Sequence, residues 1–273
     1  MKTTFKVLMF AAAILVMSIT AGLAQDYQKG LDAFYYKGDY ATALQEFRPL
    51  AEQGDPRAQN KLGIMYYNGW GVTQDYAEAA NWYRKAAEQG LADAQFKLGN
   101  MYYGGRGVIE DFEESVNWHR KAAEQGRAWA QYNLGVAFDK GHGVTQNYKI
   151  AVSWYRKAAE QGLADAQYNL GNKYYHGQGV AQDYKEAATW YRRAAEKGHA
   201  EAQYNLGVMY ENGQGVAQDT IYAHMWFNIA ASSGDAFAKK SRDIAAKKMT
   251  ASQLAEAQKL ARECKAPSLW AIS

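Results

Sequence analysis

The side chains of this chain best able to bind a metal or act as a nucleophile are five histidines and one cysteine. The histidines are His119, His142, His176, His199 and His224. His142 and His176 fall in or beside predicted loops, 34 residues apart, and are interpreted either as a metal pair or as solvated loop histidines. His119 stands where tyrosine recurs elsewhere in the chain, which favours a packed core residue. We predict no metal site.

Motifs that assemble catalytic groups are absent from the sequence. There is no zinc-binding His-Glu-x-x-His, no nucleophile elbow Gly-x-Ser-x-Gly and no phosphate-binding Gly-x-x-x-x-Gly-Lys-Ser/Thr. Gly-x-Gly-Val occurs five times, but it lies between predicted helices rather than after a strand, so its role is structural. The sequence therefore predicts no catalytic residue, no cofactor and no enzyme activity.

Charge and cysteine content narrow the class of partner. The formal net charge of +3 falls to +1 without Lys2 and Lys6. Because nucleic-acid binding needs a concentrated basic face, no nucleic-acid partner is predicted.

Because Cys264 is the only cysteine, no internal disulfide can form. We expect a half-buried, inert thiol there, with an intermolecular bridge as the alternative.

The N-terminus has the pattern of a secretory signal peptide. Lys2 and Lys6 precede an apolar run that ends near Ile19, and the small residues Gly22 and Ala24 follow it. Cleavage is predicted after Ala24, with an uncleaved anchor as the alternative. No later apolar stretch approaches the roughly 18 residues of a membrane span. The mature chain is thus predicted to be periplasmic or secreted, without a transmembrane segment.

A period of 36 residues organises the rest of the chain. It carries five tryptophans, Trp82, Trp118, Trp154, Trp190 and Trp226. Glycines and Leu-Gly pairs recur with the same spacing. A fixed period of roughly 20–50 residues is the signature of a stacked repeat array.

Residues 91–126 show how one repeat is built. Ala94 and Leu98 begin one face of a first helix, which the Gly-x-Gly-Val stretch ends. Asp111 and Glu114 form the N-terminal capping arrangement of a second helix, and Gly126 ends it. Each repeat is therefore predicted to be a pair of helices.

Small and large side chains divide the packing between these helices. Gly99 and the pair Ala122-Ala123 are small where two helices approach closely, whereas Trp118 and Tyr102 fill the space between neighbouring pairs. One pair cannot bury these residues alone, so neighbours must complete the core.

The predicted organisation has four parts. They are a signal peptide (1–24), an N-terminal tetratricopeptide-like half repeat (25–54), five full repeats (55–90, 91–126, 127–162, 163–198 and 199–234) and C-terminal capping helices (235–273).

The recurring pattern resembles the Sel1-like repeat, a relative of the tetratricopeptide repeat. The match is nearly complete from Ala164 to Gly198, including Leu170-Gly171, Asp183 and Trp190. This resemblance implies an all-α fold, an α/α right-handed superhelical solenoid, acting as a scaffold or adaptor for one or more proteins. Bacterial secreted members are commonly periplasmic regulators or assembly factors, which implies partners in the cell envelope.

An alternative function is a cell-wall protein that binds or acts on peptidoglycan or another carbohydrate. One Sel1-like subfamily, the Helicobacter cysteine-rich proteins, is described as having weak β-lactamase activity, and each of its repeats carries a cysteine pair. The five repeats here have no cysteine, so that activity is not transferred.

Positions that vary between repeats are the candidates for recognition of a partner. On the first helices these positions carry aromatic rings, amides and a lysine, which could form a groove for an extended protein segment. The candidate residues are Phe96, Lys97, Asn100, Tyr132, Asn133, Tyr168, Asn169, Asn172, Tyr204 and Asn205. The alternative is that the rings pack between repeats and the amides face water.

Trp129 is a second candidate. It occupies a site that is acidic in other repeats, at Asp93, Asp165 and Glu201, near a predicted helix start. An indole in a normally charged position is either an exposed anchor for a partner or part of the packing between repeats.

Overall fold

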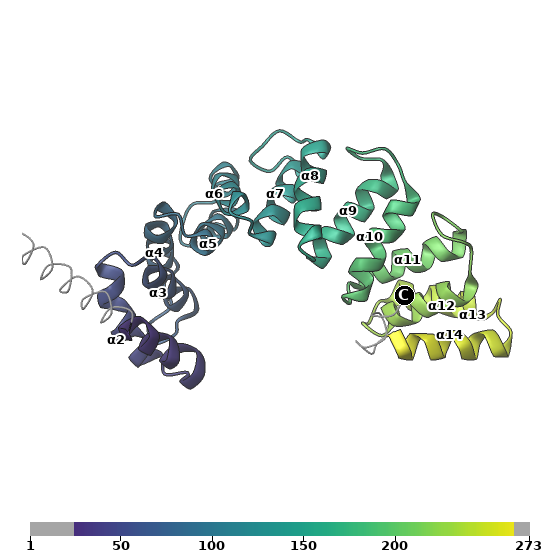
Figure 1. Ribbon diagram of the computed structural model, residues 1–273, viewed down its shortest axis with the longest axis horizontal. Coiled ribbons are helices and arrows are strands. Elements are labelled where there is room, and N and C mark those ends of the chain that lie inside the picture. The colour runs from purple at the N-terminus through teal and green to yellow at the C-terminus, as the bar shows by residue number, and fades with distance from the viewer. Residues whose placement is uncertain (1–24, 265–273) are drawn as a thin grey trace, which may run out of the picture. The chain divides into compact units, whose positions relative to one another are not determined.

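The computed structural model describes residues 25–264, which form helices joined by turns and loops, with no strand among them (Figure 1). This confirms the predicted all-α class. The predicted signal peptide (1–24) and the end of the predicted capping segment (265–273) lie outside the described residues. The chain divides after Gln125 into two compact units, called here the N-terminal unit and the C-terminal unit.

Helices follow one another in antiparallel pairs. After helical residues 25–32, the N-terminal unit contains the π-helix η1 (Ala33–Lys37), α2 (Tyr40–Glu52), α3 (Pro56–Asn68), α4 (Tyr76–Glu88), α5 (Ala92–Tyr103) and α6 (Phe112–Glu124). The C-terminal unit contains α7 (Ala128–Lys140), α8 (Tyr148–Glu160), α9 (Ala164–His176), α10 (Tyr184–Glu196), α11 (Ala200–Asn212), α12 (Thr220–Ala231), α13 (Ala236–Ala246) and α14 (Ala251–Cys264). From α2 to α6 and from α7 to α13 every helix packs against the next one, and α14 packs against α12.

Local sequence signals set the ends of the helices. The Asp111 carboxylate accepts a hydrogen bond from the backbone N–H of Glu114 at 2.9 Å, as the capping arrangement predicts. Pro56 is the first residue of α3, where its missing N–H is not needed. Gly126 follows α6 with a φ of 89°, a left-handed conformation that glycine adopts without strain.

The long loops are tied to the preceding repeat by glycine. A Cβ atom at Gly107 would lie 2.1 Å from the carbonyl oxygen of Tyr76, the first residue of α4, and the φ of Gly107 is 71°. Gly215 has the same relation to Tyr184 in the C-terminal unit. Since any side chain would collide with backbone there, these loops must be glycine-rich whatever the protein binds.

Glycine also permits the close contact between paired helices. A Cβ atom at Gly63 would lie 2.5 Å from the ring of Tyr83, and one at Gly99 would lie 2.7 Å from the ring of His119. Each second helix therefore presses an aromatic ring onto a glycine of the first helix, as predicted for Gly99. We call these five rings the second-helix rings; they are Tyr83, His119, Tyr155, Tyr191 and Phe227.

The tryptophans fill the space between repeats. Trp82 joins the apolar cluster formed with α2 and α3, whereas Trp118 joins the next cluster along the chain, with α4 and α5. Trp190 does the same with α8 and α9 in the C-terminal unit. Four of the five tryptophans are therefore part of the core, and Trp154 is half-buried.

A ladder of glutamines adds hydrogen bonds that sequence reasoning missed. Gln95 is buried and donates from Nε2 to the carbonyl oxygen of Ala87 at 3.1 Å. Gln125 then donates to the Gln95 Oε1 atom at 2.8 Å and to the Gly90 carbonyl oxygen at 2.9 Å. The ladder satisfies buried backbone acceptors that the ends of second helices leave open.

This ladder is interrupted in the C-terminal unit. Gln161 donates to Gln131, but Lys197 stands where the next glutamine is expected. The Oε1 atom of Gln167 is consequently buried without a hydrogen-bond partner among the described residues, and so is that of Gln203.

Candidate functional site

The predicted groove residues lie on the first helices, and their rings are half-buried rather than fully exposed. Each ring packs against the second-helix ring of its own repeat. The ring centres are 5.7 Å apart for Phe96 and His119, 5.9 Å for Tyr132 and Tyr155, 5.9 Å for Tyr168 and Tyr191, and 5.6 Å for Tyr204 and Phe227. These contacts join the helices of one pair and leave part of each ring accessible.

The amides of the C-terminal unit bind tyrosine hydroxyls. Asn172 accepts a hydrogen bond from the Tyr191 hydroxyl at 2.6 Å, and Asn169 donates to the Tyr132 hydroxyl at 3.4 Å. The Asn205 amide acts on the pKa of the Tyr191 hydroxyl in the lowering direction, against the larger effect of burial, which raises it. These amides therefore hold the rings in place and are half-buried, as is Asn133.

In the N-terminal unit Asn100 is exposed, and its Oδ1 atom lies 2.9 Å from Nε2 of His119. Nδ1 of the same imidazole lies 3.4 Å from the Ser115 hydroxyl. This Ser-His-Asn chain resembles a nucleophile with its base, but Ser115 and His119 are buried, so the hydroxyl is closed to a substrate. Burial lowers the pKa of His119 to about 4, and the packed-core prediction for it is confirmed.

Trp129 has 45% of its surface exposed at the start of α7. Its ring meets the edge of Tyr132 at 5.8 Å between centres. Tyr132 receives the hydrogen bond of Asn169, and Tyr168 stacks on His199 at 4.5 Å. The predicted residues Trp129, Tyr132, Tyr168 and Asn169 thus join α7 and α9, with His199 at the N-cap of α11, into one accessible surface, called here the aromatic face.

The remaining reactive residues have less chemistry to offer. His176 is exposed and His142 is half-buried. Within residues 25–264, no three histidine, cysteine or acidic side chains are grouped so that they could hold a metal ion. Cys264 is a free, half-buried thiol, and burial raises its pKa to about 11, which suppresses the reactive thiolate.

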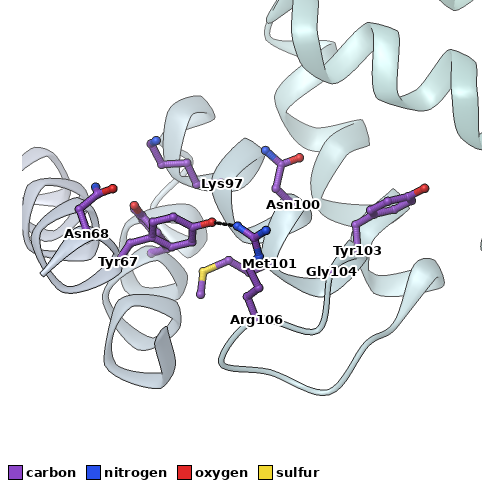
Figure 2. A pocket seen from close by; sticks show the side chains of 9 residues that line it. Tyr67, Asn68, Lys97, Asn100, Met101, Tyr103, Gly104 and Arg106 are labelled. Atoms are coloured by element: carbon purple, nitrogen blue, oxygen red, sulfur yellow. Dashed lines mark hydrogen bonds between the residues drawn. The ribbon is translucent and has the colours of Figure 1, made fainter. Parts of the chain in front are cut away.

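A cavity of about 450 Å³ opens between α3 and α5, with Tyr83 of α4 also in its wall. Its polar lining is formed by Tyr67, Asn68, Tyr83, Lys97, Asn100 and Arg106. Sequence reasoning singled out Lys97 and Asn100 but missed the others. Figure 2 shows the Tyr67 hydroxyl directed at the Arg106 guanidinium, which donates a hydrogen bond to it, while Tyr103 extends away. We call this cavity the donor pocket.

Electrostatics in the donor pocket favour a negatively charged group. Lys97 and Arg106 bring two positive charges, and the lining contains no aspartate or glutamate. Lys97 Nζ lies 5.8 Å from the centre of the Tyr83 ring. Burial raises the pKa of the Tyr83 hydroxyl, so that hydroxyl stays protonated as a hydrogen-bond donor.

A buried ion pair occupies the matching place in the C-terminal unit. Lys173 is 6% exposed and binds the carboxylate of Asp139. The Tyr155 hydroxyl donates to the other oxygen of the same carboxylate at 3.2 Å. Sequence reasoning missed this pair; its signal is a lysine where three other repeats have Met65, Met101 and Met209.

Glycine-tethered helix pairs, a tryptophan period and a glutamine ladder define a helix-pair repeat protein. The family model for the Sel1 repeat matches residues 56–91, 92–126, 130–163, 164–199 and 200–235. The chain belongs to the Sel1 repeat family, as its sequence resemblance predicted, and its fold is a Sel1-repeat solenoid.

Comparison with solved structures finds two relatives that are more than 30% identical in sequence. A Sel1 repeat protein from Oxalobacter formigenes is 34% identical, with a TM-score of 0.75 over 88% of this chain and 97% of that one. A protective antigen present in uropathogenic Escherichia coli strains is 33% identical, covering 89% of this chain and 68% of its own, with a TM-score of 0.43. A search of curated proteins found no match.

Family membership sets the general function. Sel1-repeat proteins generally mediate protein–protein interactions, and the fold is typically a non-enzymatic scaffold. In the described part of the chain, every helix is too short or too polar to cross a membrane.

Proposed function

We propose that this protein is a non-enzymatic scaffold of the bacterial cell envelope that binds extended segments of partner proteins on the first helices of its repeats. The envelope location rests on the signal-peptide pattern of residues 1–24. Binding to proteins rests on the family and on the aromatic face of the C-terminal unit.

The observation that carries the proposal is the exposure of Trp129 in a position that is acidic in other repeats. The indole has 45% of its surface exposed to water. Because removal of apolar surface from water is favourable, a partner that covers the indole gains binding free energy. The edge contact with Tyr132 fixes the indole before binding, so little conformational entropy is lost.

The neighbouring groups suit a polypeptide chain. Half-buried tyrosine rings give contact area with few rotatable bonds, and amides offer both a donor and an acceptor to a peptide backbone. Since the Asn169 and Tyr132 side chains are already bonded to each other, their orientation is set in advance.

Site-specific photocrosslinking in intact cells tests the binding surface. A photoreactive phenylalanine analogue at position 129 should crosslink to a defined segment of a partner, identified by mass spectrometry. The matched control is the same analogue at Phe237, which is 76% exposed on α13. Equal crosslinking from both positions would contradict binding at the aromatic face.

A substitution checks the energetic role of the indole. Trp129→Asp restores the acidic residue of Asp93 and Asp165, so it should leave the fold intact. Loss of a central aromatic anchor typically costs about 2 kcal/mol or more, so binding of the crosslinked segment should weaken about 30-fold.

N-terminal sequencing of the envelope fraction tests the location, and a chain that retains residues 1–24 in the cytosol would contradict it.

A further inference from the structure

The second-helix rings carry a hydrogen-bonding group in four repeats, and the structure shows which group faces each one. His119 faces Asn100, Tyr155 donates to Asp139, and Tyr191 donates to Asn172. The hydroxyl of Tyr83, the remaining member, makes no hydrogen bond to any residue from 25 to 264 and lines the donor pocket.

The missing acceptor has a cause in the sequence. Asn172 accepts a hydrogen bond from Tyr191, and the residue at the same repeat position near Tyr83 is Ile64. Asn205 also lies beside Tyr191, and the residue at its repeat position near Tyr83 is Lys97. The acceptor amide of position 172 is thus replaced by an apolar group, whereas the amide of position 205, which donates to the Tyr191 oxygen, is replaced by a cation that can only donate.

Other donors point into the same cavity. The Tyr67 oxygen accepts from Arg106, which leaves its own proton to donate. Together with Lys97 and Tyr83, four donor side chains line the cavity, and two of them are cations. A negatively charged acceptor can accept hydrogen bonds from several of these groups at once.

The C-terminal unit shows which acceptor this framework holds. There the chain places its own Asp139 carboxylate against the Tyr155 hydroxyl, and Lys173 supplies the positive charge. Asp139 occupies the repeat position of Tyr67, so the carboxylate and the donor pocket use the same place in the repeat.

We propose that the donor pocket binds a carboxylate, the side chain of a glutamate or aspartate in a partner segment. This inference rests on the proposed function, because the carboxylate belongs to a bound protein. Lys97 and Arg106 supply the charge, Tyr83 and Tyr67 donate through their hydroxyls, and the segment continues along α3 and α5.

NMR titration of the full chain, labelled at its methionine methyl groups, tests the pocket directly. Met101 lies in the pocket wall, and Met209 holds the same position in the repeat of the C-terminal unit, so it serves as an internal control. The probes are acetyl-Gly-Glu-Gly-amide, the same peptide with glutamine, and inorganic phosphate. We expect the glutamate peptide to shift Met101 and to leave Met209 unchanged.

Two variants connect the shift to the donors. Lys97→Asn with Arg106→Gln introduces the residues of positions 205 and 214 and should weaken glutamate-peptide binding by about 100-fold, roughly tenfold for each cation. Tyr83→Phe, which keeps the ring on Gly63, should weaken binding about fivefold.

The outcomes separate this inference from the proposed function. Equal shifts with the glutamate and glutamine peptides, or a response to phosphate alone, would overturn the carboxylate assignment. Crosslinking at Trp129 would remain in that case. If crosslinking fails but the glutamate peptide still shifts Met101, the carboxylate site stands and the aromatic face is wrong.

Discussion

Tyr83 in the N-terminal unit and Tyr191 in the C-terminal unit sit in the same place in their repeats and have opposite surroundings. The Tyr191 hydroxyl is satisfied within the chain by Asn172, and Gln214 accepts from the Tyr175 hydroxyl nearby at 3.1 Å. Around Tyr83 the matching positions are Ile64 and Arg106. The same backbone framework therefore gives the tyrosine hydroxyl an acceptor in one unit and, among the described residues, none in the other.

This difference teaches that recognition in a repeat protein can be sought where the internal pairing is incomplete. The repeat fixes where each hydroxyl lies, and a few substitutions decide whether it is satisfied internally. Variants that exchange these substitutions between the units are the most direct test.

The largest effect is expected at the internal carboxylate. Asp139→Asn leaves the ammonium group of Lys173 buried without its counter-charge, which should cost about 3–5 kcal/mol. The double variant with Asp139→Tyr and Lys173→Met, the residues of the matching pair Tyr67 and Met101, should recover most of this loss. Urea unfolding followed by circular dichroism measures both, and an Asp139→Asn variant as stable as the parent chain would show that the ion pair does not matter.

His119 should make the stability of the N-terminal unit depend on pH. Burial lowers its folded-state pKa from 6.5 to about 4, so the unfolded chain binds the proton first. Stability is fully present above about pH 6.5 and should fall by about 2–3 kcal/mol as the pH drops toward 4. Thermal melts across this range should lose that dependence in His119→Tyr, which installs the tyrosine of the other repeats.

Transplanting the donor pocket should create binding in the C-terminal unit. Asn172→Ile, Asn205→Lys and Gln214→Arg reproduce Ile64, Lys97 and Arg106. We expect the glutamate peptide to shift the Met209 methyl group with at least about tenfold higher affinity than in the parent chain, since two cations are gained. Without Asn172→Ile the gain should be smaller, because the Tyr191 hydroxyl keeps its internal acceptor.

The smallest effect concerns the glutamine ladder. Lys197→Gln should supply the missing donor to the buried Oε1 atom of Gln167 and stabilise the C-terminal unit by about 1 kcal/mol. Gln125→Lys breaks the intact ladder of the N-terminal unit and is the matched control, with a destabilisation of similar size. The midpoint of urea unfolding measures both, and a stabilising Gln125→Lys would contradict this role of the ladder.

Much of the fold could be predicted because its determinants are local. Helix ends are set within three or four residues, so they can be recognised in the sequence of a single repeat. Examples are the cap of Asp111, the start of α3 at Pro56 and the glycine after α6. Repetition then indicates which residues are shared by every copy. The contact of Gly99 with a second-helix ring follows from the same comparison.

The candidate site was only partly predictable. Variation between repeats pointed to Lys97, Asn100 and Trp129, but not to Arg106 or Tyr83. Tyr83 looks conserved in type with Tyr155 and Tyr191, and its difference lies in what surrounds it. Residue types alone do not show whether a hydroxyl has an acceptor.

By itself, the sequence determined the helix pairs, their caps, their loops and the family, because these depend on spacing within and between 36-residue repeats. The tertiary structure decided which polar groups meet. Asp139 reaches Lys173 across 34 residues, whereas Tyr83 lines a cavity together with Lys97 and Arg106. A hydrogen bond forms or fails over tenths of an ångström, and only packed helices set distances that finely.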